Sequence, residues 1–169
     1  MVTGMGGNHE KNRSAMDNEG FYTMKGYERA NVDELTSSME DYLEMVCRME
    51  AEGYPVRVSL LAANLHVRPS SASKMLDNLK AAGYIDFRKY GAVMVTDKGH
   101  AQGRYLLHRH RVLQEFFCAL NHTDSELEQV EKIEHYINRR TVENMERMLP
   151  QAVSSFTCAR CPGFISFRQ

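Results

Sequence analysis

The sequence predicts a mainly α-helical chain with an N-terminal winged helix-turn-helix DNA-binding domain and a C-terminal helical domain. One observation is that two amphipathic segments are separated only by residues 66–68, a turn short enough for a helix-turn-helix. Another is that two short apolar runs follow, residues 84–87 and 92–96, joined by a turn with two positive charges. A helix-turn-helix followed by a basic hairpin is a winged helix.

The helices are predicted from apolar periodicity and from their end signals. Ser37 or Ser38 can cap the first, with Glu40 placed for a capping box. Pro69 suits the first position of the third, and Gly83 can end it. The predicted helices span residues 37–53, 59–65, 69–83, 97–120, 124–137 and 141–149.

Four segments follow from this pattern. Residues 1–31 are polar and punctuated by glycine, so we expect a mobile N-terminal arm. Residues 32–97 form the winged helix-turn-helix domain, and residues 98–153 form the second helical domain. Residues 154–169 form a tail with two cysteines in a Cys-x-x-Cys motif. A zinc site there would need two more ligands, so we expect an unstructured tail with two thiols.

Composition excludes several classes of protein. No apolar run is long enough to span a bilayer, and residues 1–20 lack the apolar stretch of a secretory signal. The four cysteines are irregularly spaced, which indicates a reducing compartment without a disulfide framework. We therefore expect a cytoplasmic protein with no membrane partner.

Charge is segregated along the chain although the formal net charge is only −1. Residues 32–53 carry seven acids and one base, and residues 123–149 carry seven acids and four bases. Between them, residues 57–111 carry ten bases and three acids. This pattern suggests a polyanion on one surface and cations where the acids converge, although solvated helix faces that differ in sign would give the same pattern.

The third helix has the composition of a DNA-reading helix. Short hydroxyls and positive charges crowd its first turn, where they can reach phosphates and base edges. One of its serines is expected to cap the helix. The hairpin turn adds two more bases. The candidate DNA-binding residues are Arg68, Pro69, Ser70, Ser71, Ser73, Lys74, Arg88 and Lys89.

Metal-binding side chains recur on three helices. Asp41 and Glu44 are three residues apart on the first helix, so their carboxylates share a face. Residues 131–135 place two glutamates and a histidine at positions i, i+3 and i+4, and His110 lies on the long helix between. Each set alone is common on solvated helices. Converging carboxylates repel one another unless a cation neutralises them, so the three together favour a divalent metal.

These segments resemble the diphtheria toxin repressor family of metalloregulators, and within it the manganese transport regulator branch. The resemblance covers residues 35–150 and rests on motifs in the expected order. They are Ser38-Met39-Glu40-Asp41-Tyr42-Leu43-Glu44, the helix Val67–Leu79, Val95-Thr96-Asp97-Lys98-Gly99, Arg109-His110 and Val130-Glu131-Lys132-Ile133-Glu134-His135. The Cys158-x-x-Cys161 tail has no counterpart that we can assign.

The resemblance implies a homodimer that binds Mn(II), one or two ions per subunit, and then represses manganese-uptake genes at a palindromic operator in double-stranded DNA. Residues 98–153 would then be the metal-binding and dimerisation domain. The implied ligands are Asp41, Glu44, His110, Glu131, Glu134 and His135. The iron branch has methionine and cysteine where this chain has Asp41 and Glu131, and hard oxygen suits Mn(II) better than sulfur does. Fe(II), Co(II), Zn(II) or Cd(II) could substitute.

The predicted mechanism is a population shift: metal joins the two domains and holds the two recognition helices about one DNA turn apart. Three alternatives remain. The first is an Fe(II)-responsive repressor with the same ligands. The second is a metal-dependent hydrolase, although the sequence offers no catalytic base beyond the ligands. The third is a metal-free regulator with an organic effector. We expect no enzymatic activity and no organic ligand.

Overall fold

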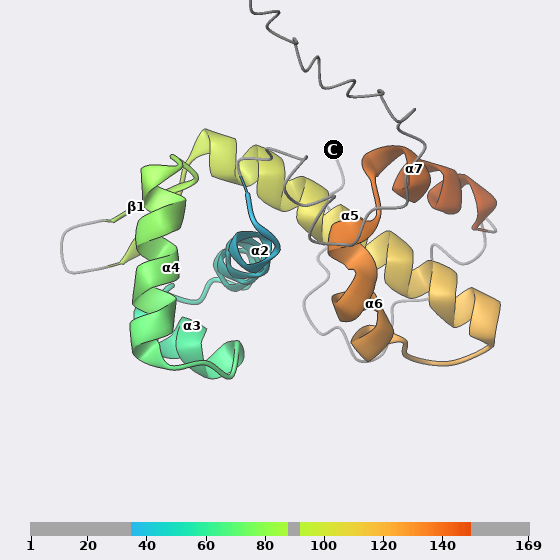
Figure 1. The fold of residues 1–169 in the computed structure, drawn as a ribbon, viewed down its shortest axis with the longest axis horizontal. Coiled ribbons are helices and arrows are strands. Elements are labelled where there is room, and N and C mark those ends of the chain that lie inside the picture. The colour runs from blue at the N-terminus through green and yellow to red at the C-terminus, as the bar shows by residue number, and fades with distance from the viewer. Residues whose placement is uncertain (1–34, 88–91, 150–169) are drawn as a thin grey trace, which may run out of the picture. The chain divides into compact units, whose positions relative to one another are not determined.

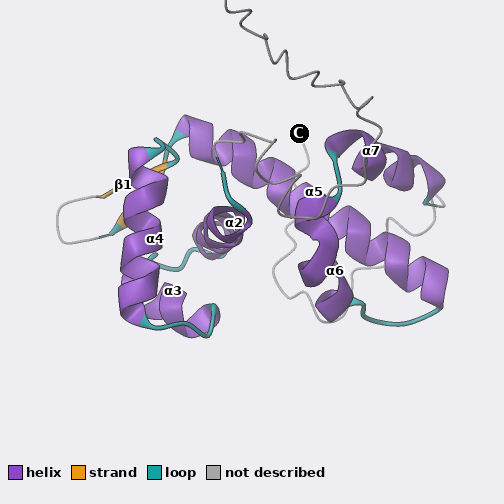
Figure 2. Cartoon of the chain, in the orientation of Figure 1, coloured by secondary structure: helices purple, strands orange, loops and turns teal. Residues whose placement is uncertain are grey.

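The computed structural model describes residues 35–87 and 92–149, all of which belong to the compact unit Glu34–Gln169. The mainly α-helical fold with a small hairpin, predicted from the sequence, is confirmed (Figures 1 and 2). The predicted N-terminal arm, the basic turn residues Arg88 and Lys89, and the Cys-x-x-Cys tail lie outside the described residues. The elements are α2 (Ser37–Ala51), α3 (Val58–Asn64), α4 (Pro69–Ala81), β1 (Ile85–Phe87), β2 (Val93–Val95), α5 (Asp97–Asn121), α6 (Leu127–Ile133), the 3-10 helix η1 (Glu134–Tyr136) and α7 (Arg139–Met148).

The helix-turn-helix is built on one apolar core. Helices α2, α3 and α4 contact one another in all three pairs. The turn between α3 and α4 places His66 at a φ of 52°, in the left-handed region. The residues of this core that are fully buried are Leu43, Val46, Leu61, Ala72, Leu76 and Leu79, and Leu106 of α5 joins them. Burial of this face, rather than helix propensity, stabilises the three short helices together.

The hairpin follows α4 directly. Gly83 leaves α4 at a φ of +79°, a conformation that glycine adopts without steric cost. Strands β1 and β2 pair antiparallel, with Ile85 opposite Val95 and Phe87 opposite Val93. Ile85, Val93 and Val95 are buried, so one face of the hairpin packs on the core.

Helix α5 connects the core to the last helices. It contacts α2 and β2, which precede it in the chain, and α6, η1 and α7, which follow it. Beyond Leu106 its apolar side chains form a second buried set with the last helices, namely Val112, Leu113, Val130 and Val142. None of the described helices is both long enough and apolar enough to cross a bilayer.

Two local predictions were wrong at helix ends. The N-cap of α2 is Thr36, whose hydroxyl accepts a hydrogen bond from Met39 N at 3.3 Å, so Ser37 and Ser38 lie inside the helix. The segment predicted as one helix over residues 124–137 is shorter: α6 ends at Ile133, and residues 134–136 tighten into η1. This tightening changes the directions of the side chains that follow it.

Candidate metal centre and nucleic-acid interface

Three elements supply the donor atoms of the candidate metal centre. Helix α2 contributes Asp41 and Glu44, one helical turn apart, and α5 contributes His110 from its middle. The 3-10 helix η1 contributes Glu134 and His135. Because α2 and η1 both pack on α5, these side chains are brought into two groups despite their separation in sequence.

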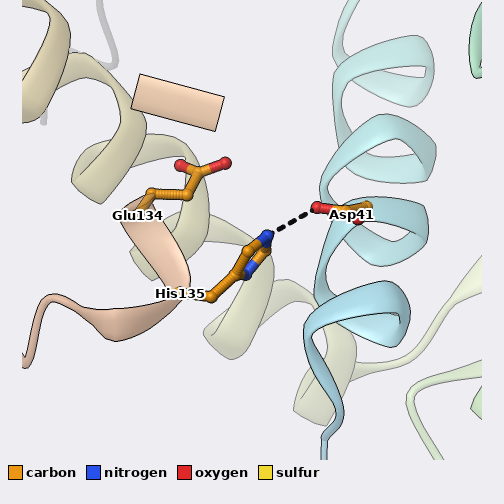
Figure 3. Close-up of side chains that lie close together, drawn as sticks. All are labelled: Asp41, Glu134 and His135. Carbon is orange, nitrogen blue, oxygen red and sulfur yellow. Dashed lines mark ion pairs between the residues drawn. The ribbon is translucent and has the colours of Figure 1, made fainter. Parts of the chain in front are cut away.

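The first group consists of Asp41, Glu134 and His135, each with a donor atom within 4.8 Å of the others. His135 extends from η1 towards α2, and its Nε2 lies 2.9 Å from Asp41 Oδ1 (Figure 3). The side chain of Asp41 is 47% exposed, so solvent reaches this group.

The second group consists of Glu44, His110 and Glu134, all buried. His110 Nδ1 lies 3.3 Å from Glu134 Oε2 and 3.7 Å from Glu44 Oε1. Glu134 belongs to both groups, and a carboxylate with two oxygens can serve two neighbouring ions.

The electrostatics of these groups fit a divalent cation. Burial raises the pKa of Glu44, and the neighbouring Glu134 raises it further despite ion pairs with His110 and Arg48. Among the described residues, Glu134 Oε2 has no hydrogen-bond partner, and its charged neighbours are His110 at 3.3 Å and Arg109 at 3.9 Å. Buried carboxylates without full compensation are costly, and a cation would stabilise them. The donor set is oxygen and imidazole nitrogen without sulfur, which suits hard or borderline divalent metals.

His135 carries an unusual charge balance. Burial lowers its pKa, but hydrogen bonds to Asp41 and Glu40 and the charge of Asp41 outweigh that effect and raise the pKa to about 9. At neutral pH the imidazole is therefore protonated in the metal-free chain. Its positive charge offsets the negative charges of Glu40 and Asp41 when no metal is bound.

Sequence reasoning missed the two residues that surround His135. Glu40, expected in a capping box, instead directs Oε2 to Arg109 Nη2 and to His135 Nδ1, each at 2.8 Å. Arg109 is buried, with a side chain only 4% exposed. The pKa of Glu40 is lowered because these two cationic partners outweigh burial, which alone would raise it. The contacts join residues 69 and 95 positions apart, so no local pattern could have revealed them.

Glu131 is not brought to the other candidate ligands. It is exposed and is absent from both groups, whereas Glu134, three residues later, is buried. The expected i, i+3, i+4 face does not form, because the change from α6 to η1 falls between these residues.

The candidate DNA-binding surface lies along the first turns of α4. All six described candidates, Arg68, Pro69, Ser70, Ser71, Ser73 and Lys74, are exposed. Ala72, Leu76 and Leu79 on the opposite face are fully buried in the core. The expectation that one serine caps α4 was wrong: the N-cap is Arg68, without a side-chain capping hydrogen bond, so Ser70 and Ser71 do not act as caps. Arg88 and Lys89 lie outside the described residues.

Comparison with known proteins assigns both halves of this architecture. Residues 34–93 match the iron dependent repressor N-terminal DNA binding domain, and residues 96–154 match the iron dependent repressor metal binding and dimerisation domain. A transcriptional regulator of Oceanobacillus iheyensis, named HTH-type transcriptional regulator MntR, is 38% identical over 112 residues, which are 65% of this chain and 76% of that protein. The chain belongs to the iron-dependent repressor family.

The family predicted from the sequence is thereby confirmed, and with it a metal-dependent transcriptional repressor with a DNA-binding domain and a dimerisation domain. Proteins with the same MntR name in Shouchella clausii and Listeria welshimeri are 39% and 37% identical. The alignments cover 61% and 65% of this chain, and 73% and 78% of those proteins. The name agrees with the predicted manganese transport regulator branch.

Two solved structures share the fold of this chain. The structure titled manganese regulator SloR and that of the metal-dependent transcriptional regulator MtsR each give a TM-score of 0.61 at 24% identity. Each alignment covers 68% of this chain and 54% of the other, so the chain spans about half the length of those proteins.

Proposed function

We propose that this repressor is activated by Mn(II), binds a palindromic operator as a homodimer and represses manganese-uptake genes in the cytoplasm, without enzymatic activity. The observation that carries the proposal is the position of Glu134. This residue belongs to both donor groups, which together join α2 of the DNA-binding domain to α5 and η1 of the metal-binding domain.

The proposed ligands are Asp41, Glu44, His110, Glu131, Glu134 and His135, for one or two ions per subunit. Five of them form the two groups, and Glu131 would have to reorient to join them. When bound, Mn(II) supplies positive charge where acids from separate elements converge. Three of the grouped residues are carboxylates, and hard oxygen ligands suit Mn(II), although Fe(II), Co(II), Zn(II) or Cd(II) can occupy similar sites.

The ligands on α2 connect metal binding to DNA binding. Leu43 and Val46 of the same helix are fully buried in the core that carries α4. Fixing Asp41 and Glu44 therefore restricts the position of the whole core relative to η1. A metal-free dimer would sample more arrangements and bind the operator more weakly, in proportion to the fraction that is competent.

Exposed residues on α4, α5 and α7 support the proposed DNA and dimer contacts. Ser70, Ser71 and Lys74 are exposed on the first turns of α4, and in this proposal those turns enter the major groove. Leu120 and Met148 are 60% and 72% exposed on α5 and α7, and a partner subunit would cover them. A two-fold dimer requires two symmetric half-sites.

The test is fluorescence anisotropy of labelled palindromic DNA, titrated with the full chain in Mn(II), Fe(II), Co(II) or Zn(II). Binding should require metal and should be lost in Glu134→Ala and His135→Ala. It should persist in the control Glu128→Ala, because that glutamate is 85% exposed on α6 and pairs only with Lys132 among the described residues.

Other outcomes would replace the proposal. Activation by Fe(II) but not Mn(II) at cellular concentrations would make this an iron-responsive repressor. Metal-independent DNA binding would favour an organic effector, and turnover of a phosphoester by the metal-loaded chain would reveal a hydrolase. A loss in Glu131→Ala as large as that in Glu134→Ala would show that Glu131 joins the site.

A further inference from the structure

We propose that Glu40 and Arg109 are positioning residues of the metal centre: Glu40 holds Nδ1 of His135 so that Nε2 faces the ion, and Arg109 holds Glu40. The inference rests on the proposed metal-binding function. It assigns a role to two side chains that lie beside the donor groups without belonging to them.

The hydrogen bonds define the orientation of the His135 ring. Glu40 Oε2 lies 2.8 Å from Nδ1, and Asp41 Oδ1 lies 2.9 Å from Nε2. A carboxylate can only accept, so Nδ1 carries the proton in the contact with Glu40. Arg109 Nη2, at 3.4 Å from Nδ1, is also a donor and cannot bond to a protonated Nδ1. By the same rule Nε2 donates to Asp41 in the metal-free chain, so each ring nitrogen carries a proton there. Asp41 belongs to a donor group and Glu40 does not, so a metal would displace the proton on Nε2 and leave Nδ1–H on Glu40.

Arg109 fixes the carboxylate that orients the ring. Its Nη2 donates to Glu40 Oε2 at 2.8 Å, so one oxygen accepts from both Arg109 and His135. The guanidinium is buried, which leaves it few alternative partners. A metal-binding histidine that donates its second ring N–H to a carboxylate is held in one tautomer and one orientation, and its basicity increases.

Each positioning residue is the neighbour of a candidate ligand in the sequence. Glu40 precedes Asp41 on α2, and Arg109 precedes His110 on α5. Consecutive residues on a helix point about 100° apart, so one side chain of each pair can face the ion while its neighbour faces the region behind His135. Each helix thus contributes a candidate ligand and a positioning residue.

The experiment measures Mn(II) affinity of the full-length protein by competition with a fluorescent chelator. We compare Glu40→Gln with the matched control Glu50→Gln, which removes the same charge from the same helix. Glu50 also contacts a histidine, His100, at 3.5 Å, but it belongs to neither donor group. Glu40→Gln should weaken Mn(II) binding by about 10–100-fold. Glu50→Gln should change it less than twofold, and Arg109→Lys, which keeps the charge but loses the planar fork, should be intermediate.

A spectroscopic measurement separates positioning from a general structural effect. In the Zn(II)-loaded wild type, a two-bond ¹H–¹⁵N correlation should show His135 protonated at Nδ1, with a downfield, slowly exchanging proton. That proton should move upfield and exchange faster in Glu40→Gln and stay unchanged in Glu50→Gln.

The outcomes distinguish this inference from the proposed function. No metal binding by the wild type would overturn both. Normal wild-type binding with unchanged affinity in Glu40→Gln would overturn the positioning role alone. So would a His135 ring that is protonated at Nε2 and bound through Nδ1 in the wild type, a result that does not depend on any variant folding.

Discussion

Gly103 of α5 lies against Cys47 of α2, and the contact leaves no room for a side chain. A Cβ at Gly103 would clash with the Cys47 sulfur and would lie 3.2 Å from the Cys47 Cβ. We expect Gly103→Ala to destabilise the protein, because overpacking costs about 1–3 kcal/mol and outweighs the gain of about 1 kcal/mol in helix propensity. Urea unfolding of the metal-free protein measures the effect. In a Cys47→Ala background the same substitution should be much less harmful, and an equal loss in both backgrounds would contradict the steric explanation.

Cys47 should also be chemically inert in the folded chain. Burial raises the pKa of its thiol to about 12, and the charges of Glu50 and Glu44 add to this effect. Only the thiolate reacts, so at pH 8 the folded thiol should be alkylated about three orders of magnitude more slowly than an unfolded one with a pKa of about 8.5. The measurement uses iodoacetamide on a variant with serine at Cys118, Cys158 and Cys161. Similar rates with and without denaturing urea would refute the expectation.

At the level of elements, α5 ends in a strained residue. His122 caps this helix in the left-handed region, at a φ of 55° and ψ of 44°. Such a conformation costs an L-residue about 1–2 kcal/mol, and glycine adopts it readily. His122→Gly should therefore raise the free energy of unfolding by up to about 1 kcal/mol, less than the full strain because glycine gains freedom in the unfolded chain. Ala101→Gly, at an exposed position within α5, should lower it by about 1 kcal/mol. Thermal unfolding of both variants checks the opposite signs.

At the level of the whole molecule, we expect DNA binding and metal binding to depend on different residues. Lys74 is exposed on the first turns of α4, and Lys80 near the other end of the helix pairs with Asp86 at 2.9 Å. Lys74→Ala should weaken operator binding. It should also reduce the slope of log affinity against log salt concentration by about one, because one fewer counterion is released. Mn(II) affinity of the free protein should remain unchanged, because no ligand is lost.

Lys80→Ala serves as the control and should leave operator binding close to wild type. Anisotropy at several salt concentrations and chelator competition provide the two measurements. A parallel loss of metal and DNA affinity in Lys74→Ala would contradict this division. In the wild type, linkage requires that operator DNA tighten Mn(II) binding by the same factor by which Mn(II) tightens DNA binding.

Part of the candidate site could be predicted from residue spacing alone. Asp41 and Glu44 share a face because α2 is a regular helix. The approach of His110 to Glu44 depends instead on the packing of α5 on that helix. The structure does not place Glu131 beside the other candidate ligands, because a helical spacing argument holds only while the helix continues. The transition to a 3-10 turn at Glu134 depends on how this segment packs on α5. The segment contains no glycine or proline that would predict the end of a helix there.

The sequence by itself determined the winged helix-turn-helix, the charged face of α4, the family and most of the candidate ligands, because each depends on local periodicity, turn chemistry or motif order. The tertiary structure decided that Glu40 and Arg109 converge behind His135 and that Glu134 belongs to two groups. The physical reason is distance along the chain: contacts between α2, α5 and η1 arise from the packing of whole helices on a shared core. Such packing depends on all the buried side chains together, so no short segment encodes it.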